Sequence, residues 1–207
     1  MAKAPRIKAT VGPFTFAYPH LTAPDTEGQY ADNKYKVDGI EAPTSDAMKR
    51  AKKVVADAVK ELGLPKGAML PLKEQTAKND KGFPEPTGDL LFRAKSQFAP
   101  MLVDSRGKPI EGNALAKLKV GAGSRGLLQG YFSTYVAAGK PGMSFTLTGV
   151  QLLSVVSNGG GAEFSAWEGE GGFTMDDDDA GGDGLQLGPD TDEDDDASVG
   201  DGGILDI

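Results

Sequence analysis

The chain has 207 residues, of which 30 are acidic, 22 are basic, one is histidine and none is cysteine. A chain of this length forms one domain with extensions, or two small domains. Without cysteine it has no thiolate nucleophile, no disulfide and no thiolate-bound metal, and one histidine excludes a site that needs several. No apolar run approaches the roughly 18 residues of a membrane-spanning helix, and the first residues do not resemble a signal peptide, so we expect a cytoplasmic protein.

The charge is divided unevenly along the chain. Residues 1–140 contain all 22 basic residues and 14 acidic ones, which gives a formal charge of +8. Residues 141–207 contain 16 acidic residues and no basic one. A basic body followed by an acidic segment is typical of proteins that bind nucleic acid, or of proteins whose acidic segment binds a partner.

The first third of the chain predicts two strands and one helix. Residues 6–18 and 34–40 alternate between polar and apolar side chains, as strands with one buried face do. Residues 45–62 are expected to be helical, because Thr44 or Ser45 can cap the N-terminus and Gly63 with Pro65 ends the pattern. The helix has these apolar residues at helical spacing: Ala47, Met48, Ala51, Val54, Val55, Ala58, Val59 and Leu62. Its basic residues are interpreted as a solvated face.

The middle and the end of the body predict a long loop and further strands. Residues 64–88 contain four prolines and read as a long basic loop, which in a compact domain is often functional. The expected strands are 90–98, 100–103, 115–120, 126–137 and 143–156, with a turn at 104–108 and a hairpin turn at 139–142. Short strands with one helix between an early and a late group indicate a mainly β protein, an OB-fold-like barrel of five strands or an elaborated version of it. We assign this domain to residues 1–157.

Three patterns that could indicate an enzyme, a nucleotide site or a metal site lack the required context. Residues 121–126 match G-x-G-x-x-G, but they lead into a strand rather than a helix, and the next carboxylate is the distant Glu163. His20 has no nucleophile motif near it. The alternating aspartates at 190–196 have Asp195 where a calcium-binding EF-hand loop needs glycine. We therefore expect no enzymatic activity, no cofactor and no dedicated metal site.

Residues 158–207 are expected to be a disordered acidic tail. Their glycine and aspartate runs cannot bury enough apolar surface to offset the entropy of ordering. The chain nevertheless ends in a cluster with three large aliphatic side chains, which we expect to bind a partner protein: Ile204, Leu205, Asp206 and Ile207. The alternative is a solubilising tail whose last residues have no role.

The late strands each combine an apolar face with a cationic or tyrosine-bearing face. Alternation places Arg93 and Lys95 opposite Phe92, Ala94 and Phe98. It likewise separates Lys117 and Lys119 from Leu118, and Tyr131 and Tyr135 from Phe132 and Val136. Cations that follow a phosphate backbone and rings on which bases stack are what single-stranded nucleic acid requires. The candidate phosphate-binding residues are Arg93, Lys95, Lys117, Lys119 and Arg125, the stacking residues are Tyr131 and Tyr135, and further candidates on an earlier strand are Tyr35 and Lys36.

The order of several segments resembles the single-stranded DNA-binding proteins of tailed bacteriophages. The similar segments are residues 18–21, 24–25, 34–37, 102–108, 117–120 and 150–153, followed by glycines 159–161, Trp167 and a short acidic tail. The resemblance implies an OB-fold, usually dimeric, that coats single-stranded DNA during replication, recombination and repair. It also implies a tail that recruits replication proteins such as polymerase, helicase or primase and competes with DNA for the basic groove. The chain departs from the best-known members at its last residue, which is Ile207 where they have an aromatic.

Two other classes of function remain open from the sequence. One is an adaptor or chaperone-like protein that acts through its acidic tail without binding DNA directly. The other is a nuclease or nucleotide-processing enzyme, which is disfavoured because no paired carboxylates accompany a candidate base.

Overall fold

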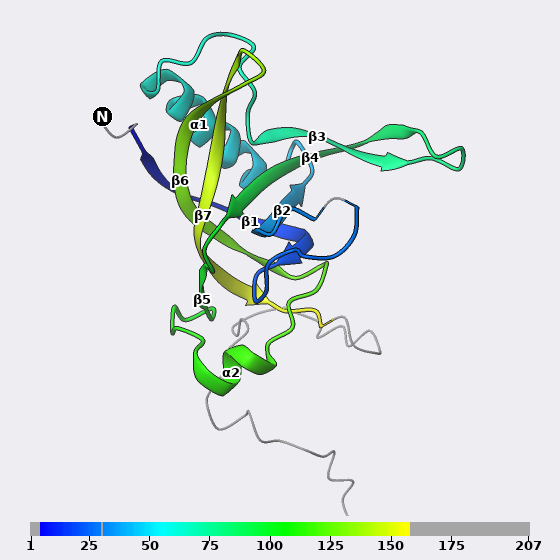
Figure 1. Cartoon of the computed structure of the whole chain (residues 1–207), viewed down its shortest axis with the longest axis vertical. Helices are drawn as coiled ribbons and strands as arrows, with labels where there is room; N and C mark the ends of the chain where they lie inside the picture. Colours follow the sequence, from blue (N-terminus) through cyan, green and yellow to red (C-terminus); the bar gives the residue numbers. More distant parts are fainter. Residues whose placement is uncertain (1–4, 30, 158–207) are drawn as a thin grey trace, which may run out of the picture.

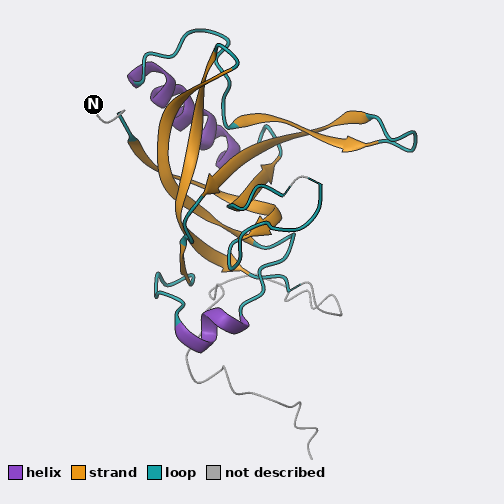
Figure 2. Ribbon diagram, viewed as in Figure 1, coloured by secondary structure: helices purple, strands orange, loops and turns teal. Residues whose placement is uncertain are grey.

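The structure is a computed structural model that describes residues 5–29 and 31–157. The described part contains two helices and seven strands (Figures 1 and 2). The elements in chain order are β1 (Ile7–His20), β2 (Tyr35–Glu41), α1 (Asp46–Glu61), β3 (Leu72–Lys78), β4 (Pro84–Ser96), β5 (Met101–Val103), α2 (Gly112–Lys117), β6 (Arg125–Ala137) and β7 (Lys140–Ser154). Neither of these helices is long and apolar enough to cross a membrane.

The sheet closes into a barrel. Its strands follow the order β3-β4-β2-β1-β6-β7-β5, and β4 also pairs with β7. That last pairing is parallel and joins Ala94 to Phe145 and Lys95 to Thr146. The strands β1, β2, β4, β7 and β6 therefore form a closed ring, which confirms the predicted mainly β, OB-fold class.

The barrel interior is filled by aromatic side chains from four strands. Phe92 on β4 stacks on Phe14 at 5.6 Å between ring centroids and meets the edge of Phe145 at 5.1 Å. Phe132 packs against Phe145 at 4.9 Å, and all four rings are almost fully buried. These contacts tie β1, β4, β6 and β7 together, since each strand contributes one of the rings.

The helix α1 has the boundaries and the buried face that the sequence predicts. Ser45 is the N-cap, and its side chain accepts a hydrogen bond of 3.1 Å from the Met48 N–H. The N–H of Leu62 closes the last turn, after which Gly63 takes a φ of +64° that favours glycine. The buried face packs mainly against β1 and joins the core through Met48, Ala51, Val55 and Ala58.

The predicted loop at 64–88 is wrong over much of its length, because β3 and the first half of β4 form a hairpin that projects from the barrel (Figure 1). Pro84 and Pro86 pair with Lys78 and Thr76 in this hairpin. The pairing of β2 with β4 starts only at Leu90, so this part of β4 has a free edge. Proline has no N–H to donate to a neighbouring strand, and it is tolerated on this free edge because no strand pairs there.

The predicted strand at 115–120 is also wrong, because these residues follow or belong to the short helix α2. Ala114 and Leu118 are buried and lie four residues apart, which is helical spacing. Lys117 and Lys119 therefore do not lie on a sheet face. Six residues of alternation are too few to distinguish the two structures.

Two residues of the predicted apolar faces are exposed because they lie at or beyond the ends of their strands. Phe98 follows the end of β4, and Val136 lies beside the β6–β7 turn, so both are exposed instead of buried. Tyr18 is exposed because the pairing of β1 with β2 shifts between Ala17 and His20. The hairpin turn itself is Ala138–Gly139, with φ values of 49° and 73° that suit a two-residue turn.

The glycine-rich residues 121–126 form a structural corner before β6, which confirms that a strand follows them. Ser124 is fully buried, and its hydroxyl donates to the Gly121 carbonyl at 2.7 Å. The same oxygen accepts a hydrogen bond of 2.9 Å from the Val156 N–H. The corner thus fixes the point where the chain leaves β7. The acidic tail that follows lies outside the described residues.

Two glycines in the β6–β7 hairpin provide a test of this packing. A Cβ at Gly130 would overlap the Thr146 carbonyl oxygen and lie 2.7 Å from the Phe145 ring. At Gly149 its nearest neighbour would be the end of the Gln129 side chain at 3.1 Å, and the Met101 carbonyl oxygen at 3.5 Å would be in ordinary contact. Gly130→Ala should therefore lower the free energy of unfolding by at least about 2 kcal/mol, because the strands must separate. Gly149→Ala should change it by less than about 1 kcal/mol, since Gln129 can rotate away. Urea unfolding of both variants measures the difference, and equal losses would contradict this packing.

Candidate nucleic-acid interface

A cavity of about 790 Å³ runs along the outside of the barrel. We call it the groove. Its walls come from the start of β3, the end of β4, the segment after β4, and facing parts of β6 and β7. The lining residues are Arg6, Lys34, Met69, Leu70, Pro71, Leu72, Lys73, Arg93, Lys95, Ser96, Gln97, Phe98, Tyr131, Tyr135, Met143, Ser144, Phe145 and Thr146.

Alternation along the strands determines which side chains face the groove. Phe92 and Ala94 on β4 are buried. Because successive side chains of a strand point to opposite faces, the next residue after each of them, Arg93 and Lys95, points outward. On β6, burial of Phe132 turns Tyr131 outward in the same way. These parts of the face prediction are confirmed.

Closure of the barrel brings the two sets of side chains together. Thr146 on β7 is in register with Lys95 on β4 and also with Tyr131 on β6. Lys95, Thr146 and Tyr131 therefore lie in one row across three neighbouring strands. The groove thus combines a cationic strand and a tyrosine-bearing strand that are far apart in the sequence.

The two cations on β4 are held by aspartates from β2 and the loop before it. Arg93 donates from Nε to Asp38 Oδ1 at 2.8 Å and from Nη2 to Oδ2 at 2.5 Å. The hydrogen bonds to Asp38 raise the pKa of Arg93. Lys95 donates to Asp32 Oδ2 at 2.7 Å, and this hydrogen bond is the main reason that the pKa of Asp32 is lowered.

A second lysine of β2 completes this charge network. Lys36 is hydrogen-bonded to Asp25 Oδ2, which is the main cause of the lowered pKa of Asp25. The other oxygen of Asp32, Oδ1, is buried without a hydrogen bond and lies 3.7 Å from Lys36 Nζ. Phosphate oxygens that approach Lys95 must therefore compete with a carboxylate that is already bound there.

Three rings border the groove. Tyr131 has the guanidinium of Arg6 4.5 Å above its ring centroid, a cation–π contact. Tyr135 is 38% exposed. Phe98 is 80% exposed, and its N–H donates to the Ser96 hydroxyl at 3.1 Å. The hydrogen bond fixes the start of the segment that carries this ring.

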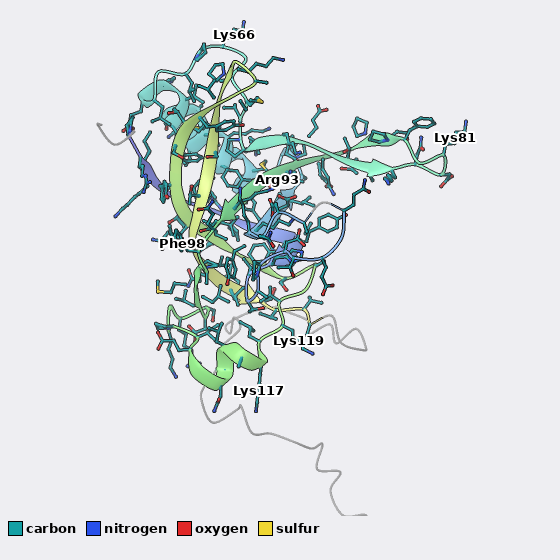
Figure 3. The ribbon with its side chains drawn as sticks, viewed as in Figure 1. Lys66, Lys81, Arg93, Phe98, Lys117 and Lys119 are labelled. Carbon is teal, nitrogen blue, oxygen red and sulfur yellow. The ribbon has the colours of Figure 1, made fainter. Side chains whose placement is uncertain are left out.

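The structure brings only some of the predicted residues into the groove: Arg93, Lys95, Tyr131 and Tyr135. Lys117 and Lys119 lie at the α2 end of the molecule, well away from Arg93 and Phe98 (Figure 3). Arg125 is at the opposite end of β6 from Tyr135, and its Nη2 lies 3.9 Å from Glu41 Oε1. Tyr35 and Lys36 do not line the groove, and only 18% of the Lys36 side chain is exposed.

Three cations and one exposed ring of the groove are not among the residues predicted from the sequence: Arg6, Lys34, Lys73 and Phe98. Lys34 is adjacent to a predicted candidate, and Lys73 belongs to the segment that was expected to be a basic loop. Phe98 was assigned to the core because the alternating pattern was extended beyond the end of the strand. Nothing in the local sequence around Arg6 indicates that it would stack on Tyr131.

The groove has the chemistry to hold a flexible polyanion with planar groups. Five cations line it, together with the exposed rings of Phe98 and Tyr135 and the partly buried ring of Tyr131. None of the described lining residues has a carboxylate. Cations bind phosphates, whereas rings bind unpaired bases irrespective of sequence. Within residues 5–29 and 31–157, no group of three or more His, Asp and Glu side chains could hold a metal ion.

Comparison with known proteins shows that the fold of this chain is similar to that of solved structures. No protein-family model matches the chain, and no curated protein matches it significantly. The single-stranded DNA-binding protein gp2.5 of bacteriophage T7 has 18% identity and a TM-score of 0.50, over 83% of this chain and the whole of that structure.

Two structures of the single-stranded DNA-binding protein of bacteriophage Enc34 are also similar. A C-terminal truncation has 19% identity and a TM-score of 0.52, over 69% of this chain and 83% of that one. A complex with single-stranded DNA has 18% identity and a TM-score of 0.52, over 69% of this chain and 84% of that one.

Proposed function

We propose that this protein binds single-stranded DNA with little sequence preference and coats it during the replication, recombination and repair of phage DNA in the host cytoplasm. The observation that carries the proposal is the groove, where five cations and three aromatic rings, two of them exposed, meet on one side of a closed barrel. The similarity of fold to two phage proteins that bind single-stranded DNA supports it. The protein acts without catalysis.

Binding in this groove combines two kinds of contact. The phosphates replace the carboxylates beside Lys95 and Arg93 and gain further contacts with Arg6, Lys34 and Lys73. Unpaired bases stack on Tyr131, Tyr135 and Phe98, at roughly 1–3 kcal/mol for each base. Stacking uses the face that every base has, which is why sequence matters little. A duplex buries these faces between base pairs, so the groove prefers single strands.

The first test is a salt-dependent titration with single- and double-stranded oligonucleotides. Each phosphate contact on a single strand contributes about −0.7 to the slope of log K against log salt concentration. Five groove cations give a slope of at most about −3.5, and fewer contacts reduce it to about −2. We expect tighter binding to the single strand at every salt concentration. A slope near zero, or a preference for duplex, would contradict the proposal and favour an adaptor that acts without DNA.

We propose in addition that the tail, residues 158–207, regulates binding and recruits replication proteins. Its acidic residues mimic a phosphate backbone and can occupy the basic groove of the free protein. DNA then displaces the tail and exposes Ile204, Leu205, Asp206 and Ile207 to a polymerase, helicase or primase. We also propose that the protein acts as a homodimer.

Two truncations separate the functions of the tail. Deletion of residues 176–207 should tighten DNA binding at low salt, and the gain should shrink near 1 M, where the screening length is roughly 3 Å. Deletion of residues 205–207 alone should leave DNA affinity nearly unchanged but weaken capture of the polymerase in a pull-down. If the long truncation binds DNA no more tightly at low salt, the tail does not compete with DNA.

A further inference from the structure

A row of outward-facing side chains crosses all five strands of the barrel. Lys36 on β2 is in register with Lys95 on β4, which is in register with Thr146 on β7. Thr146 is in turn opposite Tyr131 on β6, and Tyr131 is opposite Lys8 on β1. Paired residues project from the same face of a sheet. The row therefore continues past the groove and reaches a further lysine on the other side of Tyr131.

A second hollow of about 700 Å³ lies at that end of the row. It shares Arg6 and Tyr131 with the groove, so the cation–π pair forms the boundary between the two. Its remaining lining residues are Lys8, Ala9, Thr10, Gln129, Gly130 and Thr148. A third, smaller hollow of about 150 Å³ follows and shares Thr10 and Gln129 with the second. The three hollows thus form one continuous path over β1, β6 and β7.

The second hollow is suited to a sugar–phosphate backbone rather than to stacked bases. Lys8 is exposed and makes no ion pair with any residue in the described part of the chain. Thr10, Gln129 and Thr148 supply uncharged polar side chains, and the only ring of the described lining residues is Tyr131. None of those lining residues has a carboxylate. This differs from the β2–β4 side, where Asp25, Asp32 and Asp38 already bind the cations.

The absence of a side chain at Gly149 keeps the path open into the third hollow. A Cβ at this position would project toward the end of the Gln129 side chain, which lines both the second and the third hollow. Met101, which is exposed, lies on the far side of the third hollow. The third hollow therefore extends the path from Gln129 to Met101 on β5.

We propose that single-stranded DNA bound in the groove continues across Tyr131 and lays its backbone in the second hollow, where Lys8 binds a phosphate. This inference rests on the proposed function and extends it by assigning a path to the DNA and a role to Lys8. Three inter-strand steps of about 4.8 Å separate β4 from β1, a span of roughly 14 Å. That distance is about four times the axial rise of roughly 3.4 Å per nucleotide in a duplex, so the path adds at most about four phosphates, and fewer if the strand is extended.

The test compares Lys8→Ala with wild-type protein over oligothymidylates of about 4 to about 16 nucleotides. The shortest oligonucleotides fill the groove alone, so Lys8→Ala should bind them as wild type does. For the longest, loss of one phosphate contact should weaken binding about fivefold at 0.1 M salt and reduce the salt slope by about 0.7. Affinity should also stop increasing at a shorter oligonucleotide length than in wild type. The matched control is Lys53→Ala, an exposed lysine of α1 that lines none of the three hollows.

The outcomes distinguish this inference from the proposed function. If wild-type protein binds neither short nor long oligonucleotides, the proposed function fails and the path fails with it. If wild-type protein binds both lengths, the groove is supported. The path is then wrong if Lys8→Ala weakens binding of both lengths equally, weakens binding of neither, or has the same effect as Lys53→Ala. Lys8 is exposed, so its substitution should leave thermal unfolding unchanged, and that measurement excludes misfolding as the cause of a loss.

Discussion

The parallel pairing of β4 with β7 is the contact on which the groove depends. Without it, the cationic strand β4 and the tyrosine-bearing strand β6 would be separated by β2 and β1 in an open sheet. The buried ring of Phe92 stabilises the pairing, because it packs across this seam on Phe145, whose register partner is Ala94. Strand alternation then forces the neighbours of these buried residues outward. The same residues that fill the core thus determine which side chains the groove presents.

The charge of the groove is balanced internally before any ligand arrives. Asp32 and Asp38 hold Lys95 and Arg93 in place, so both cations are oriented while part of their field is neutralised. A phosphate that displaces a carboxylate exchanges one ion pair for another, which limits the net gain from that contact. Cations without such partners, such as Lys8, give the full benefit of a new contact. The electrostatic contribution of a residue therefore depends on its neighbours as well as on its position.

The sequence predicts the features of this fold that are local. The helix cap at Ser45 and the outward faces at Arg93 and Tyr131 follow from patterns within a few residues, and the structure confirms them. The strand predicted at 115–120 fails because so short a pattern fits a helix equally well. The projecting hairpin was missed because its prolines are tolerated on the edge of β4 that is free before the pairing with β2 begins at Leu90, and no local pattern shows where that pairing begins. Barrel closure and the aspartate partners connect residues up to 63 positions apart, and no local pattern predicts them.

The most direct test of where DNA binds is photo-crosslinking of the full-length protein to an oligonucleotide that contains bromouracil, followed by mass spectrometry of the peptides. Cross-links form where a base lies against a side chain, so they locate the path without relying on affinity. The groove predicts cross-links at Tyr131, Tyr135 or Phe98, and their loss when an excess of plain oligothymidylate competes. Cross-links confined to α2, around Lys117 and Lys119, would place the DNA at the other end of the molecule and contradict this account.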